Sequence, residues 1–127
     1  MFVQLRDRGA AAVEFALVLP VLLLLTLGIF AFGHAFHIQT VLDNAARDAV
    51  RIFALEDEGD PAAQARERAI ASASPSIALT AGQIAVGPAG CPQGQNALVT
   101  ITVTDFQLLG GVGNITLTGS GSMRCNG

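Results

Sequence analysis

The first 55 residues carry two hydrophobic patterns in succession, and together they predict one long helix. Residues 15–33 form an uninterrupted apolar run without a charged side chain, long enough to cross a bilayer. Residues 38–53 then place apolar side chains at spacings of three and four, which is typical of a helix with one buried face. We therefore expect a helix from about Ala10 to Leu55, with residues 10–36 spanning a membrane and residues 37–55 continuing beyond it.

A second, shorter helix is predicted after an acidic segment. Gly59 ends the first helical pattern, and Asp60 followed by Pro61 supplies an N-cap residue and a proline at the first helical position. The alanine-rich stretch that follows predicts a helix over residues 61–73, and Ser74-Pro75 ends it.

The remainder of the chain alternates between apolar and hydroxyl-bearing residues. This pattern predicts strands at Ala97–Asp105 and Asn114–Met123, joined by a loop over residues 106–113, with a third strand near residues 83–87. The expected fold class is α+β: a long N-terminal transmembrane and amphipathic helix, a short second helix, and a small antiparallel sheet of two to three strands, over residues 83–124, packed on the helix. Residues 37–127 would form one small extracytoplasmic domain.

Charge asymmetry gives the expected orientation of the span. Arg6 and Arg8 precede it, and acidic residues dominate the first stretch after it, so the positive-inside rule places the N-terminus in the cytoplasm. We expect a single-pass protein of a bacterial cytoplasmic (inner) membrane with its C-terminal domain outside. The rival interpretation is a secretory signal peptide cut before His34, although the apolar run is longer than the usual 7 to 15 residues.

Composition argues against nucleic-acid binding and catalysis. The net charge is −3, and the arginines form no basic patch. His34 and His37 are three residues apart on the predicted helix but lack the further ligands of a metal site. No serine, histidine and acid are arranged as a nucleophilic set. We expect no enzyme activity, no metal and no cofactor.

The two cysteines, Cys91 and Cys125, flank the predicted hairpin. Folding of the hairpin would bring them together beyond its open end, and the side of the membrane expected for this domain is oxidising. A disulfide there would close a loop of about 35 residues and stabilise the fold by about 3.8 kcal/mol in the chain-entropy model. The alternative is two free thiols.

Glu14 is the one acidic or basic residue between Ala10 and Gly33. An unpartnered carboxylate in a membrane-spanning helix costs about 2.5 kcal/mol or more, so a partner for it is expected. The alternative without a functional role is that Glu14 lies at the membrane surface and its carboxylate reaches water.

Gly9-Ala10-Ala11-Ala12-Val13-Glu14-Phe15 resembles the processing site of type IV prepilins. The resemblance implies a leader over residues 1–9, a cut between Gly9 and Ala10, and Glu14 as the fifth residue of the mature chain. The cut would free an α-amino group on Ala10, which is largely protonated at neutral pH and four residues from Glu14 on the same helix face.

The longer stretch RGAAAVEFALVLPVLLLLTLGIFAFG, followed by DNAARDAVR at residues 43–51, is similar to the TadE-like family of the tight-adherence, or Flp-type, pili. Glu14 and Phe15 would then serve assembly and register, and Pro20 would kink the helix, bending it or loosening its hydrogen bonds near Ala16.

The resemblance implies a minor pilin or pseudopilin that takes part in Flp/Tad-type pilus assembly, for adhesion and surface attachment. Its implied partners are membrane lipid, a prepilin peptidase, other minor pilins, the major Flp pilin and inner-membrane platform proteins. The alternative function is a single-pass anchored or secreted partner-binding domain that never enters a filament.

Overall fold

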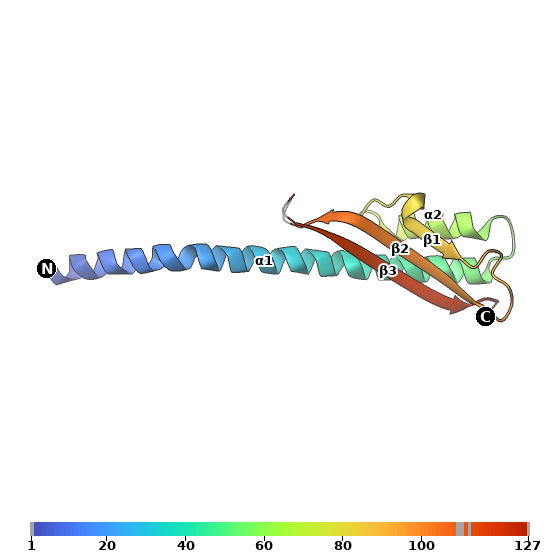
Figure 1. The fold of residues 1–127 in the computed structure, drawn as a ribbon, viewed down its shortest axis with the longest axis horizontal. Helices are drawn as coiled ribbons and strands as arrows, with labels where there is room; N and C mark the ends of the chain where they lie inside the picture. The colour runs from blue at the N-terminus through green and yellow to red at the C-terminus, as the bar shows by residue number, and fades with distance from the viewer. Residues whose placement is uncertain (1, 109–110, 112, 127) are drawn as a thin grey trace. The chain divides into compact units, whose positions relative to one another are not determined.

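The computed structural model describes residues 2–108, 111 and 113–126, with side chains from residue 7 onward. The chain divides into two compact units, Met1–Gly33 and His34–Gly127. Helix α1 (Phe2–Leu55) contributes to both (Figure 1). It is already helical within the predicted leader, because the residues before Gly9 are mostly good helix formers and one glycine lowers helix stability by only about 1 kcal/mol.

The first unit is the N-terminal part of α1, and its apolar side chains face outward. Among the described residues, one helix is long and apolar enough to span a membrane, and only 6% of its apolar window is buried. The core helix of a soluble protein would be mostly buried by its own chain. The surface of this unit is therefore available to lipid or to other helices, and it fits a membrane anchor.

The second unit has the α+β architecture that the sequence predicts. After α1 come α2 (Pro61–Ala73), a 3₁₀ turn η1 (Ala81–Gln83), β1 (Ile84–Gly87), β2 (Asn96–Gln107) and β3 (Asn114–Arg124). The three strands form one antiparallel sheet in the order β1-β2-β3. Gln83 belongs to η1 instead of the predicted third strand.

Helix α2 begins as its sequence predicts. The Asp60 side chain accepts a hydrogen bond from the Ala63 backbone N–H at 3.3 Å, and Pro61 occupies the first turn. Ala65, Ala69 and Ala73, spaced by four, are its buried residues. Their small side chains allow the helix to lie close to its neighbours.

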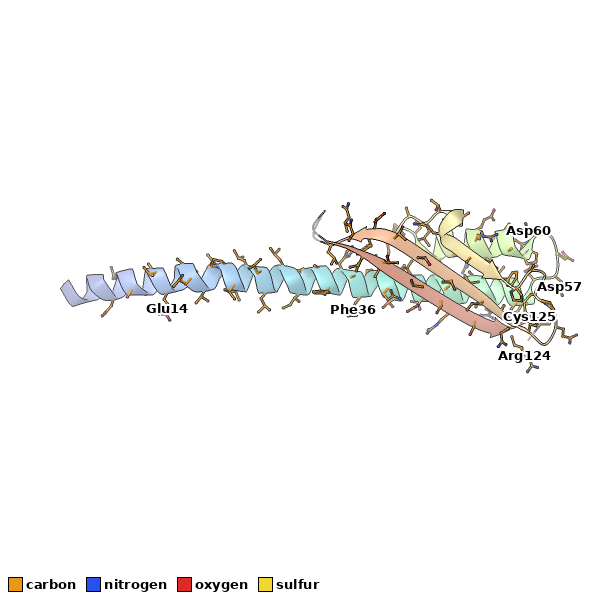
Figure 2. All side chains as sticks on the ribbon, viewed as in Figure 1. Glu14, Phe36, Asp57, Asp60, Arg124 and Cys125 are labelled. Atoms are coloured by element: carbon orange, nitrogen blue, oxygen red, sulfur yellow. A yellow bond between two sulfur atoms is a disulfide. The ribbon has the colours of Figure 1, made fainter. Side chains whose placement is uncertain are left out.

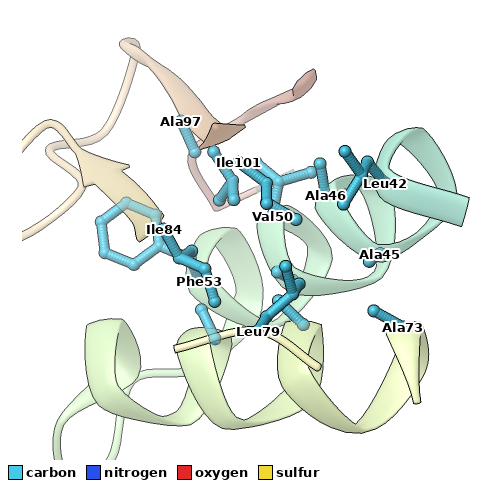
Figure 3. Packing of buried hydrophobic residues seen from close by; sticks show 14 of the residues in the cluster. Leu42, Ala45, Ala46, Val50, Phe53, Ala73, Leu79, Ile84, Ala97 and Ile101 are labelled. Atoms are coloured by element: carbon cyan, nitrogen blue, oxygen red, sulfur yellow. The ribbon is translucent and has the colours of Figure 1, made fainter. Parts of the chain in front are cut away.

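One hydrophobic core joins the sheet to the helices (Figure 3). Along β2 the odd-numbered residues from Ala97 to Val103 are buried, whereas Leu98 on the opposite face is 50% exposed. The helix side of the core comes from an α1 stripe: Ile38, Leu42, Ala45, Ala46, Ala49, Val50 and Phe53. The predicted packing of the sheet on the amphipathic part of the helix is confirmed.

Strand β2 is longer than predicted because it contains a bulge. Val103 pairs with Leu117 and Phe106 pairs with Ile115, so two residues of β2 lie opposite one residue of β3. Asp105 takes a positive φ of 58° within this bulge. The extra residue lets the strand continue through Gln107, which shortens the predicted loop of residues 106–113. Positions 109, 110 and 112 of that loop lie outside the described residues.

Candidate functional site

The residues of the predicted processing site lie on one continuous stretch of helix α1. Gly9, Ala10, Glu14 and Phe15 are all exposed (Figure 2 labels Glu14). Ala10 and Glu14 are four residues apart and therefore share a helix face. Their side chains are available for contacts with another molecule.

Gly9 has no packing role among the residues whose side chains the structure describes. A Cβ atom built on it would meet nothing within 4 Å. The same holds for Gly28 and Gly33 in this unit. A requirement for glycine at position 9 would therefore have to come from outside the described fold.

Pro20 lies inside α1, as the sequence requires. Proline has no backbone N–H, so the hydrogen bond that position 20 would donate to Ala16 is missing. Six residues on, the Thr26 hydroxyl donates to the Leu22 carbonyl at 2.8 Å. In the first unit, α1 therefore lacks one backbone hydrogen bond, at Pro20, and the hydroxyl of Thr26 bonds to the helix itself.

The contact between α1 and β3 depends on two glycines that the sequence analysis missed. A Cβ on Gly119 would lie 2.5 Å from the Leu42 backbone carbon, and one on Gly121 would lie 2.8 Å from that of Ala46. Such distances are far inside van der Waals contact, so only glycine fits at either position. The available signal was the alternation of Leu117, Gly119 and Gly121 on the apolar face of the strand.

Two α1 side chains cover the free edge of β3. The Gln39 amide donates to the Thr118 carbonyl, and Asp43 Oδ1 accepts from the Ser120 N–H at 3.2 Å. Gln39 and Asp43 are four residues apart, so they follow one helix face. Since β3 is an edge strand, these bonds satisfy backbone groups that have no strand partner.

Cys91 and Cys125 are joined by a disulfide in the structure, with their Cα atoms 5.6 Å apart. The bond links the segment after β1 to the end of β3. Two backbone bonds lie beside it: Cys125 donates to Gln95 and Asn126 donates to Ala54, both at 2.9 Å. The end of the chain is therefore attached both to the β1–β2 connection and to the last turn of α1.

In the described part of the chain we find no cluster of side chains typical of a catalytic site. No group of three or more His, Cys, Asp or Glu side chains there could hold a metal ion. A hollow on the outer face of the sheet is lined by Ala85, Leu98, Thr100 and their neighbours, and its lining contains no titratable side chain. The arrangement provides surfaces for packing and contact.

Comparison with known proteins identifies the N-terminal part of the chain. Residues 9–51 match the family model of TadE, described as TadE-like protein. No curated protein and no solved structure matches the chain. The TadE-like family is a structural, pilus-related family, and the match associates the chain with a Tad pilus. The resemblance predicted from the sequence is confirmed for this part of the chain: residues 9–51 match the TadE-like family.

Proposed function

We propose that this protein is a minor pilin or pseudopilin of a Tad pilus, made as a membrane-inserted precursor and cut after Gly9 by a prepilin peptidase. The observation that carries the proposal is the exposed Gly9–Phe15 segment at the head of an exposed apolar helix, within the matched residues 9–51. A Cβ atom at Gly9 would meet nothing within 4 Å in the described part of the chain, which suits recognition by an external enzyme.

Glu14 would act in assembly after that cut. In lipid its carboxylate needs a positive partner, and cleavage provides one as the α-amino group of Ala10. The amine can belong to the same chain, where Ala10 and Glu14 share a helix face, or to a neighbouring subunit. In either case the pair offsets the free-energy cost of placing the acid in a low-dielectric region and fixes the axial position of the helix.

The second unit would lie outside the cytoplasmic membrane and provide the surface that partners recognise. Its disulfide suits an oxidising compartment. The pilus association suggests contacts with other pilus components. The specific partners we propose are other minor pilins, the major Flp pilin and the inner-membrane platform.

Mass spectrometry of the protein purified from a cell with an active Tad system tests the proposed processing. We expect Ala10 as the first residue of the mature chain. Gly9→Val should block the cut, because a branched side chain would occupy the position next to the scissile bond. Gly28→Val is the matched control: it also meets open space in the chain, and processing should remain normal.

The same measurement distinguishes the alternative, an anchored or secreted domain that never enters a filament. A mature chain that starts at His34 would indicate a secretory signal peptide, and an intact Met1 would indicate a plain membrane anchor. Either result would contradict processing after Gly9.

A further inference from the structure

One side of helix α1 in the second unit is exposed among the described residues. Thr40, Asn44, Arg47 and Arg51 follow one another at spacings of three and four, so they lie on one side of the helix, and all four are exposed. This side is about opposite the stripe of α1 that packs in the core. We call these four residues the arginine stripe, because its charges are the two guanidinium groups.

The acids of α1 that could pair with these arginines form hydrogen bonds elsewhere in the chain. Asp43, four residues before Arg47, accepts a hydrogen bond from the backbone of β3 at 3.2 Å. Asp48, three residues before Arg51, accepts one from a hydroxyl of α2 at 2.8 Å. The two carboxylates are thus directed to either side of the stripe, which presents positive charge to its surroundings.

A segment of opposite charge follows the end of α1. The connection between α1 and α2 contains four acids and is exposed throughout. Asp60 among them caps α2, which leaves the carboxylates of Glu56, Asp57 and Glu58 for other contacts. We call these three residues the acidic loop, and Figure 2 shows Asp57 at the end of the second unit. Arg124 lies at the same end and offsets one of the three negative charges.

The arginine stripe and the acidic loop are complementary in charge, so a second copy of this chain carries the partner that each surface lacks. The sequence contains no lysine, and the planar guanidinium of arginine can bind a carboxylate through two hydrogen bonds. One exposed ion pair contributes little to binding. Two guanidinium groups facing three carboxylates form several pairs at once, which favours one orientation of the two copies.

We propose that the arginine stripe of one copy binds the acidic loop of a second copy. Because the two surfaces differ, each bound pair still offers one free stripe and one free loop. The contact is therefore heterologous and can extend into an open row of subunits. It uses residues of the second unit alone and requires neither the cut after Gly9 nor the pairing of Glu14, so it is independent of the proposed processing.

Sedimentation equilibrium of the full chain in density-matched detergent tests this contact by exchange of charge. Arg47→Glu with Arg51→Glu makes the stripe acidic, and Glu56→Arg with Asp57→Arg makes the loop basic. Each double variant alone should associate at least about fivefold more weakly than the parent, because like charges then face each other. An equimolar mixture of the two should regain most of the parent association, since the reversed stripe matches the reversed loop.

Salt and a control variant show whether the effect is electrostatic and local. Raising NaCl from about 0.1 M to about 1 M shortens the Debye length from about 10 Å to about 3 Å and should weaken association of the parent. Arg51→Glu alone should also weaken it. Arg68→Glu is the matched control, because it reverses an exposed arginine of α2 outside both surfaces, and association should stay unchanged.

Three results would overturn the proposal. The parent could remain monomeric at about 0.1 mM protein. It could associate with no response to charge reversal or salt, which would assign the contact to other surfaces such as the apolar helix. The mixture could fail to regain association, which would show that stripe and loop do not meet. Circular dichroism checks the fold of each variant, and Arg47→Gln with Arg51→Gln replaces the reversed stripe if that variant unfolds. None of these results bears on the mature N-terminus, which mass spectrometry determines separately.

Discussion

At the scale of single residues, the carboxylates of the two units differ in their surroundings. In the second unit Asp43 accepts from the Ser120 N–H, and Asp48 accepts from the Ser72 hydroxyl at 2.8 Å. Glu14 instead lies exposed in an apolar stretch of helix. Asp43 and Asp48 thus stabilise contacts within the chain, whereas Glu14 lies exposed, as the contact with another group proposed above requires.

Replacing Glu14 should therefore affect assembly and leave the fold intact. For Glu14→Ala we expect at least a tenfold decrease in surface pili, counted by electron microscopy, with normal amounts of membrane-inserted protein. Glu14→Gln should behave similarly because it also removes the charge. Asp7→Ala is the control: the proposed cut removes this residue, so pili should be unchanged. Normal piliation with Glu14→Ala would contradict the proposed role.

The glycines of β3 should be sensitive to the smallest possible addition. Gly119→Ala and Gly121→Ala place a methyl group against the backbone of α1, which cannot move aside as a flexible side chain could. We expect each to destabilise the second unit by at least about 2 kcal/mol, which is roughly 10 °C in melting temperature for a domain of this size.

Thermal unfolding of the full chain in detergent, followed by circular dichroism, measures this effect. Gly82→Ala is the matched control, because a Cβ there meets nothing within 4 Å. A change of less than about 2 °C in both β3 variants would show that the helix and strand are not in the close contact described.

At the scale of elements, the hydrophobic periodicity was sufficient to predict which segments form helices and strands. It did not predict the detailed contacts between them. The alternation from Ala97 to Val103 and the three-four spacing from Ile38 to Phe53 are local properties, and both elements follow them. The bulge at Asp105 and the fit of Gly119 depend on the partner strand and the helix, so no local pattern specifies them. The predicted helix places Gly9, Glu14 and Pro20 on one element in sequence order, and the structure agrees, whereas the roles of these residues stay predictions.

The edge of β3 yields a prediction at this scale. Asp43→Ala removes the acceptor of the Ser120 N–H, and we expect a loss of about 1 kcal/mol, because Asp43 is only half-buried and water can replace it in part. Asn44→Ala, an exposed change one position further on the same helix, should have little effect. Thermal melts of the two variants make the comparison, and equal melting temperatures would mean that the Asp43–Ser120 hydrogen bond contributes nothing measurable.

At the scale of the whole molecule, the two units are stabilised by different means. The first has an apolar surface that its own chain leaves exposed. The second buries one core and closes it with a disulfide across a sequence separation of 34 residues. We infer that the second unit is independent in stability, whereas the first depends on its surroundings.

The disulfide should therefore account for much of the stability of the second unit. Replacing both Cys91 and Cys125 by alanine is expected to cost about 3 to 4 kcal/mol, measured by urea unfolding with reduced and oxidised parent protein as references. The reduced parent should resemble the double variant. A thiol assay on denatured, unreduced protein checks the premise, and two titratable thiols would contradict it.

Gly119 contacts Leu42, and Gly121 contacts Ala46. This pairing requires the spacing of two residues along the strand to match the spacing of four residues along the helix. Two residues of a strand advance by about 6.6 Å, and four residues of a helix advance by about 6.0 Å. The two glycines therefore meet successive turns of the helix on the same face. A single-residue insertion between positions 42 and 46 would rotate the second contact by about 100° and separate the pair. We expect this part of the helix to tolerate substitutions on its outer side but no insertion or deletion. Its length between positions 42 and 46 therefore determines where strand β3 can lie against it.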